Sequence, residues 1–166
     1  MSLEIFIDYF TQYGAIAIFV VVFLEYLNLP GFPAGVIMPL AGVWAAHGKI
    51  SFLGTMLLTV AAGVCGSWLL YLLGYKGGAF LLEKYLKRFP SQREKIEKNF
   101  EMLKKRGCIG VFIGKLIPVM RTLISIPAGV IKMDFWKYTL SSMLGVAVWN
   151  LFFVGAGYIL GDAVFG

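Results

Sequence analysis

Two long segments without a charged residue constrain the fold of this chain more than any other feature. Residues 51–75 form a stretch of 25 positions without Asp, Glu, Lys or Arg, and residues 138–161 form one of 24. A helix that crosses the hydrocarbon core of a bilayer needs about 20 apolar residues. We therefore predict an all-α integral membrane protein in which 51–75 and 135–162 cross the bilayer.

The composition also indicates a membrane protein. The chain has 166 residues, of which 59% are hydrophobic and 14% are charged, whereas a soluble domain has roughly 25% charged residues. The mean hydropathy is +0.80. No polar linker divides the chain, so we treat 1–166 as one membrane domain. A third, N-terminal span is predicted over 9–27, where Asp8 and Glu25 lie near the two ends of an apolar run.

Most of the positive charge lies in one segment. Residues 76–106 hold ten of the fifteen Lys and Arg and four of the nine acids, which accounts for the whole net charge of +6. A basic segment between apolar runs is typical of a cytoplasmic loop facing anionic headgroups, so we expect no nucleic-acid partner. Residues 78–106 are predicted to form two surface helices split by Pro90, and the second is amphipathic because Ile96, Phe100 and Leu103 recur at helical spacing. The second helix is expected to begin with a capping box at 91–94 and to end near Gly107.

Five of the six prolines lie in two further apolar stretches. They are Pro30, Pro33 and Pro39 in 28–48, and Pro118 and Pro127 in 108–131. Proline removes a backbone donor and disrupts a helix, so neither stretch suits a straight helix in lipid. Such backbone occurs at membrane depth only where protein or a wet cavity shields it. We therefore predict two re-entrant hairpins.

The two proline-rich stretches repeat each other. Pro30 and Pro39 match Pro118 and Pro127 at an offset of 88, and each half continues into a span. With the basic segment inside the cell, the first of these spans runs inward and the last runs outward, which places the N-terminus inside and the C-terminus outside. The predicted fold is an inverted repeat of re-entrant hairpin plus transmembrane helix, an arrangement typical of secondary transporters.

Arg121 is the first candidate for a functional residue, because an unpaired arginine at membrane depth costs about 3 kcal/mol or more. The available opposite charge is Glu25, which the inverted geometry could bring close to Arg121 or to Lys115, and Arg121 has either a functional role or a purely structural one in an ion pair. Glu25 has two other interpretations, a proton carrier or an interfacial side chain. If Pro118 starts a half-helix, free backbone N–H groups, the guanidinium and Lys115 together suit a phosphate. Asn150 lies mid-span and needs a hydrogen-bond partner.

Motifs for hydrolysis and for metal binding are missing from the sequence. The chain has one His, and it contains neither a glycine-rich phosphate loop nor a Ser-His-Asp set. We therefore expect a protein that is not an enzyme and that has no cofactor and no metal site.

One stretch carries a specific pattern. Residues 114–122 read Gly-Lys-Leu-Ile-Pro-Val-Met-Arg-Thr, and residues 126–129 read Ile-Pro-Ala-Gly. This pattern resembles the DedA family of bacterial membrane proteins, which is related to the VTT-domain lipid scramblases, and the resemblance extends over about 13–161. It implies a lipid flippase. Family members usually carry acids implicated in proton coupling where this chain has Gly35 and Ser67, and an arginine where it has Lys115.

We predict a substrate-binding site at Arg121, Lys115, Glu25, Thr122, Pro118, Pro30 and Asn150. The expected substrate is a lipid phosphate, either undecaprenyl phosphate or a phospholipid such as phosphatidylethanolamine, moved between leaflets of the inner (plasma) membrane by a multi-pass protein. One alternative is a proton- or cation-coupled transporter of small solutes. Another is a membrane scaffold that transports nothing. The sequence leaves a homo-oligomer open.

Overall fold

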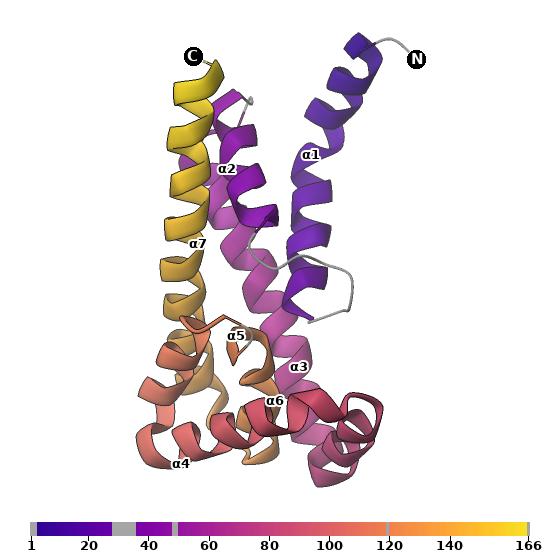
Figure 1. Ribbon diagram of the computed structural model, residues 1–166, viewed down its shortest axis with the longest axis vertical. Coiled ribbons are helices and arrows are strands. Elements are labelled where there is room, and N and C mark those ends of the chain that lie inside the picture. The colour runs from indigo at the N-terminus through magenta and orange to yellow at the C-terminus, as the bar shows by residue number, and fades with distance from the viewer. Residues whose placement is uncertain (1–2, 28–35, 48–49, 119, 166) are drawn as a thin grey trace.

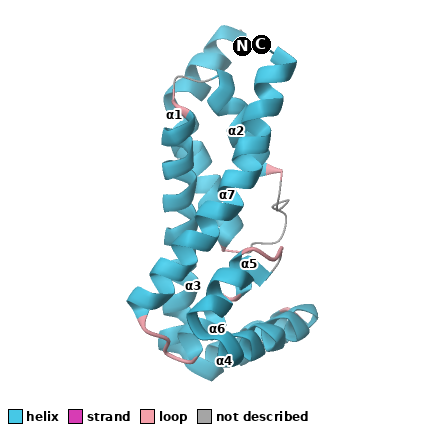
Figure 2. Cartoon of the chain, turned by 90° about the vertical axis from the view of Figure 1, so that its left-hand side faces the viewer, coloured by secondary structure: helices cyan, strands magenta, loops and turns pink. Residues whose placement is uncertain are grey.

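The computed structural model describes residues 3–27, 36–47, 50–118 and 120–165, with side chains at 13–161 within those ranges and at 163. Every regular element in these ranges is helical, as Figures 1 and 2 show. The elements are α1 (Leu3–Tyr26), α2 (Ile37–His47), α3 (Phe52–Arg88), the 3₁₀ turn η1 (Pro90–Gln92), α4 (Arg93–Lys115), α5 (Met120–Leu123), α6 (Ser125–Val130) and α7 (Phe135–Phe165). The all-helical prediction is confirmed for these residues.

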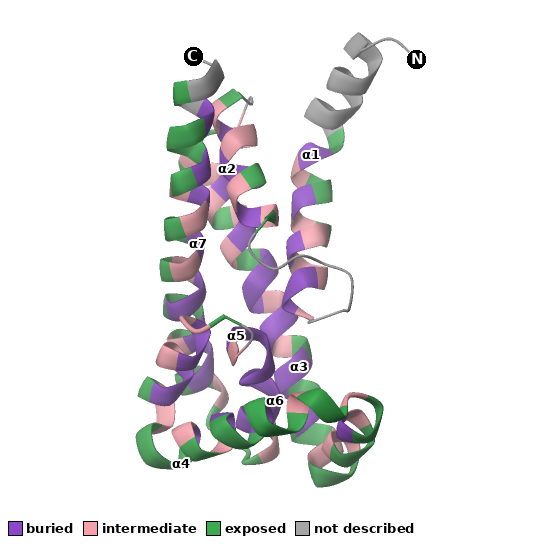
Figure 3. Ribbon diagram, viewed as in Figure 1, coloured by how far each residue is buried: buried purple, intermediate pink, exposed green. Residues whose placement is uncertain are grey.

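Among the described residues, two helices are long and apolar enough to cross a membrane. They cover Phe52–Arg88, with 37 residues, and Phe135–Gly161, with 27. Figure 3 shows that much of one side of α7 is exposed, and it includes apolar side chains such as Phe152, which is 71% exposed. Large exposed apolar surface is typical of contact with lipid. The apolar part of α1 that the structure describes is the shorter stretch Tyr13–Tyr26, so the third span stays a prediction.

Two glycines bend the long helices. Gly78 in α3 has φ +52° and Gly107 in α4 has φ +55°, a conformation that glycine adopts without steric cost. The helical segment between the bends lies across one end of the bundle (Figures 1 and 2). Its predicted apolar face is present, since Ile96 and Leu103 are buried. Ile96 packs in one cluster with Leu86 and Leu123, so part of this face contacts protein.

The predicted capping box at 91–94 is wrong. Pro90 begins the 3₁₀ turn η1, and the residue before α4 is Gln92, whose side chain makes no capping hydrogen bond. Because proline fixes its own φ near the helical value, the chain turns one residue earlier than the box requires. Ser91 therefore lies within the turn and not at the helix N-cap.

Each proline-rich stretch packs on the long helix of the other half. A Cβ added to Gly42 of α2 would lie 2.1 Å from the Val154 carbonyl oxygen of α7, and one added to Gly129 of α6 would lie 2.1 Å from the Tyr71 carbonyl oxygen of α3. Small residues allow helix backbones to approach this closely. The two crossings resemble each other, but the re-entrant course and the inverted orientation stay predictions.

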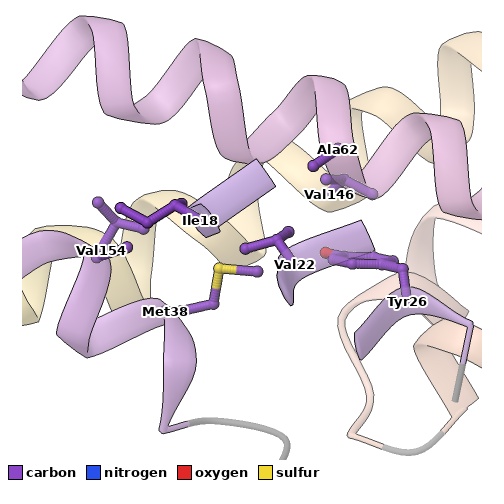
Figure 4. Packing of buried hydrophobic residues seen from close by; sticks show 8 residues of the cluster. Ile18, Val22, Tyr26, Met38, Ala62, Val146 and Val154 are labelled. Atoms are coloured by element: carbon purple, nitrogen blue, oxygen red, sulfur yellow. The ribbon is translucent and has the colours of Figure 1, made fainter. Parts of the chain in front are cut away.

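The main apolar core joins α1, α2, α3 and α7. Figure 4 shows it from close by, with Val22 and Tyr26 of α1 near Ala62 of α3 and Val146 of α7. Tyr26 is 1% exposed and forms one end of this cluster. Its ring and hydroxyl also contact the polar residues described next, so the core positions the candidate site.

Candidate substrate-binding site

Arg121 and Glu25 form a buried ion pair. Arg121 Nη2 of α5 donates to Glu25 Oε1 of α1, and each side chain is 1% exposed. The two residues are 96 positions apart in the sequence. A charged group at membrane depth requires such a partner, and the predicted pairing is confirmed.

Two aromatic rings hold the guanidinium of Arg121. Its Cζ lies 4.5 Å from the centroid of the Tyr26 ring and 4.9 Å from that of the Trp149 ring. Cations are attracted to the faces of aromatic rings, most strongly where water is excluded. The guanidinium is therefore fixed by three elements, α1, α5 and α7.

Three buried donors, one on this guanidinium and two near it, have no hydrogen-bond acceptor among the residues that the structure describes. They are Arg121 Nη1, Trp149 Nε1 and Asn150 Nδ2. A buried donor without an acceptor costs about 1–3 kcal/mol, and such groups in a native fold call for an explanation. An oxygen-rich anion among these atoms would supply the acceptors.

Lys115 forms a second polar cluster. Its Nζ donates to Ser67 Oγ at 2.7 Å and to Ser125 Oγ at 3.0 Å. The Tyr138 hydroxyl lies 2.7 Å from Ser125 Oγ and 3.0 Å from the Ser67 carbonyl oxygen. All four residues are buried, and no ion pair to Lys115 occurs in the described part of the chain. Lys115 Nζ also lies 5.8 Å from the Tyr26 ring, which joins the two clusters.

Two departures from the DedA pattern contact each other. The resemblance to the DedA family implies an arginine at the position of Lys115 and an aspartate at that of Ser67, and the two residues present here are joined by a hydrogen bond. The serine hydroxyl accepts without carrying a charge. The cluster therefore contains no carboxylate among the described residues.

The other predicted site residues have different surroundings. Thr122 is buried next to Arg121, and the Asn150 side-chain oxygen accepts from the Tyr26 hydroxyl at 3.2 Å. Pro118 is exposed in the turn before α5. Pro30 and Gly35 lie outside the described residues.

Free backbone N–H groups were expected after Pro118. The N–H groups of Met120 and Arg121 are not free, because both donate hydrogen bonds to backbone carbonyls. Met120 N donates to the Pro118 carbonyl at 2.8 Å and Arg121 N donates to the Ile117 carbonyl at 3.0 Å. The tight turn and the short α5 use these donors locally. Any anion here would be held by side chains and not by a helix N-terminus.

Sequence reasoning missed the roles of Tyr26, Trp149, Ser125 and Tyr138. Each reads as an ordinary apolar or small residue of a membrane span. The signal that was available is the pair Trp149-Asn150 within an uncharged segment, where two adjacent side chains carry polar hydrogens that need partners. The described residues contain no group of three or more His, Cys, Asp or Glu that could hold a metal ion.

Comparison with known proteins identifies relatives. Residues 29–159 match the VTT domain. The chain is 33% identical over 156 residues to the uncharacterized membrane protein YkoX of Bacillus subtilis, covering 94% of this chain and 68% of YkoX. It is 32% identical over 130 residues to undecaprenyl phosphate transporter A of the same organism, covering 78% of this chain and 66% of that protein. No solved structure matches the chain.

A further relative carries a name of a different kind. The chain is 30% identical over 167 residues to an alkaline phosphatase-like protein of Lactococcus lactis subsp. cremoris, covering 96% of this chain and 76% of that protein. The chain thus spans about two thirds to three quarters of the length of these relatives. The match over 29–159 and these identities show that this chain is a membrane protein of the VTT domain family, the DedA family that its sequence resembles.

Proposed function

We propose that this protein moves a phosphate-bearing lipid between the leaflets of the inner (plasma) membrane, with undecaprenyl phosphate as the first candidate and a phospholipid such as phosphatidylethanolamine as the second. The observation that carries the proposal is the group of buried donors at Arg121, Trp149 and Asn150 that have no acceptor among the described residues. The name of the Bacillus relative, undecaprenyl phosphate transporter A, supports the same class of substrate.

The charge of the site also suits a phosphate. The two clusters together hold two basic side chains, Arg121 and Lys115, and one acidic side chain, Glu25. A phosphate monoester carries a charge of about −1.5 to −2 near neutral pH. Arginine offers a planar fork of donors to such a group. In the proposed cycle the phosphate takes the place of Glu25 on Arg121, and Glu25 returns when the lipid leaves.

The proposed path across the membrane uses the two proline-rich stretches. Each would enter the bilayer as a re-entrant hairpin, and the inverted repeat would open the site to one leaflet at a time. The polar headgroup would cross within the protein while the hydrocarbon chains stay in lipid. The paired crossings of α2 on α7 and of α6 on α3 support this arrangement.

Two alternative functions can each be distinguished from lipid transport by the behaviour of one variant. A proton- or cation-coupled transporter of small solutes needs Glu25 as a titrating acid, so Glu25→Gln would abolish its activity, whereas a flippase without proton coupling tolerates the change. A scaffold that transports nothing would lose packing in Arg121→Ala but would show no transport defect in the folded protein. A phosphatase, the enzyme class to which the name of the Lactococcus relative, alkaline phosphatase-like protein, refers, would release inorganic phosphate.

The experiment is lipid translocation in proteoliposomes. Vesicles contain polyprenyl phosphate or phosphatidylethanolamine with a group that an added reagent detects only in the outer leaflet. We expect the wild type to move at least one of these lipids and Arg121→Ala to abolish the movement. Movement of neither lipid by folded wild type would contradict the proposal.

A milder variant guards against misfolding of Arg121→Ala. Trp149→Phe removes the unpartnered Nε1 donor and keeps an aromatic ring beside Arg121. A hydrogen bond to a charged group contributes about 1.5–3 kcal/mol, so the affinity for the lipid phosphate should fall about tenfold or more. The matched control is Trp136→Phe, because Trp136 is a tryptophan of the same helix that is 73% exposed. It should behave as the wild type.

A further inference from the structure

An apolar cavity lies at the bend of α3. Its volume is about 270 Å³, and we call it the α3 cavity. Leu70 and Leu73 line it from the part of α3 before Gly78, and Leu81 and Leu82 line it from the part after. The positive φ of Gly78 turns the helix between these two sets. The cavity therefore exists because the helix bends there.

The α3 cavity adjoins the charged clusters. Ser125 of α6 accepts from Lys115, and the next residue, Ile126, lines the cavity. Leu27, which also lines it, follows two residues after Glu25. The same two elements, α6 and the end of α1, thus contact the polar site and the apolar cavity.

The surroundings of the α3 cavity indicate a hydrocarbon occupant. Tyr85 carries the one side-chain hydroxyl in a lining that is otherwise apolar. Leu69 and Leu73, which also line it, are 40% and 43% exposed, and the medium around a membrane helix is lipid. Pockets for whole drug-sized ligands measure about 300–1,000 Å³, so this volume suits one segment of a chain.

Positively charged residues lie on the part of α3 after Gly78, which also lines the cavity. Lys84, Lys87 and Arg88 are exposed on the part of α3 after Gly78, the same part that supplies Leu81 and Leu82 to the lining. Basic residues at a membrane surface attract anionic lipid. An anionic lipid would therefore gather beside this opening more often than a neutral one.

We propose that the α3 cavity holds a segment of the hydrocarbon chain of the lipid phosphate whose headgroup is bound at Arg121. The identity of that lipid rests on the proposed function. The occupied cavity keeps the chain next to α6 while the phosphate reaches the donors on the other elements. It thereby selects long-chain phosphates over free phosphate or water-soluble phosphate esters.

The test is photolabelling in proteoliposomes. Two probes carry a diazirine in the hydrocarbon chain, one a polyprenyl phosphate and the other a phosphatidylethanolamine, and labelled residues are mapped by mass spectrometry. We expect labelling of residues 69–82 to exceed labelling around Leu57 by about fivefold, a difference of roughly 1 kcal/mol in binding. Leu57 is the reference because it is 64% exposed on the same helix and does not line the cavity.

Filling the cavity provides the control. Leu73→Trp and Leu81→Trp each place a larger side chain in it, and both should reduce the labelling of residues 69–82 to the level at Leu57. Leu57→Trp should leave that labelling unchanged. Labelling that is uniform along α3, or that survives both filling variants, would overturn the assignment.

Translocation measured on the same vesicles separates this proposal from the proposed function. If lipid moves but labelling is uniform, the α3 cavity is not a chain site and the function stands. If neither lipid moves and the cavity is still labelled and blocked by Leu73→Trp, the chain site stands and the transport function fails. Arg121→Ala should lose translocation while its cavity remains labelled.

Discussion

Arg121 and Lys115 are both buried basic residues of the same molecule, but their side chains have different polar partners. Arg121 has a carboxylate partner in Glu25 and two aromatic rings, and it keeps a donor without an acceptor among the described residues. Lys115 has hydroxyl partners in Ser67 and Ser125. The comparison indicates that Arg121 is paired with a carboxylate and keeps a donor for a ligand, whereas Lys115 is hydrogen-bonded to hydroxyl groups and has no carboxylate partner among the described residues.

The largest effect is expected for Arg121→Ala. It leaves the buried Glu25 carboxylate without its cation, and breaking a buried pair in this way costs about 3–5 kcal/mol. Translocation should be lost as well. Thermal unfolding in detergent measures the stability change. The double variant Arg121→Met with Glu25→Leu should recover much of the stability but none of the transport, and recovery of transport would refute the role of Arg121.

Lys115→Met should distinguish the role of the Lys115 cluster from that of the Arg121 ion pair. It removes a buried amine that has no carboxylate partner among the described residues, so no carboxylate is left unpaired. Stability should change by about 1 kcal/mol or less, while translocation should fall about tenfold because the site loses a hydrogen-bond donor for the phosphate. A loss of stability as large as that of Arg121→Ala would show that the two cations do not differ as described.

Ser67→Asp should make Lys115 resemble Arg121. The introduced carboxylate would lie where Ser67 Oγ now contacts Lys115 Nζ at 2.7 Å, and when ionised it would cancel the charge of the cluster. Translocation by the variant should therefore be higher at acidic pH, where the carboxyl is protonated, and fall several-fold as the pH rises through the pKa of that group. Rates at pH 5 to 8 test this, with Ser67→Asn as the uncharged control. Parallel profiles for the two variants would count against it.

The smallest effect is expected for the exposed ion pair of α4. Lys98 donates to Glu94 at 2.6 Å, and this hydrogen bond holds the pKa of Glu94 below its usual value and raises the pKa of Lys98. Both side chains are largely in solvent, where such pairs contribute little. Lys98→Ala should leave translocation unchanged. A clear loss would mean that the surface helix takes part in transport.

The sequence predicts the helices better than the contacts. Uncharged runs mark α3 and α7 because membrane helices cannot carry many charges, and the scarcity of buried charge predicts that Arg121 pairs with Glu25. The ring of Tyr26 and the donors of Trp149 and Asn150 come together only in the packed bundle. The pair Trp149-Asn150 indicates that two polar groups need partners, but the residue types do not indicate which side chains lie beside them.

Local rules failed where the backbone had a competing choice. The box at 91–94 is a sound pattern for a helix start, but Pro90 imposes a 3₁₀ turn first. The backbone N–H groups of Met120 and Arg121, which were expected to be free, donate to the nearby carbonyls of Pro118 and Ile117. In both cases a proline restricts the backbone conformation of its neighbours, and this restriction decides which local hydrogen bonds form.

Recognition of a lipid phosphate by the donors around Arg121 can be measured by native mass spectrometry. The purified protein in detergent is mixed with equal amounts of a polyprenyl phosphate and the corresponding polyprenol. We expect the wild type to bind the phosphate about tenfold more tightly than the alcohol, a difference of about 1.4 kcal/mol, and Arg121→Lys to lose this preference because lysine lacks the planar fork. Equal binding of the two lipids by the wild type would show that these donors do not recognise the phosphate.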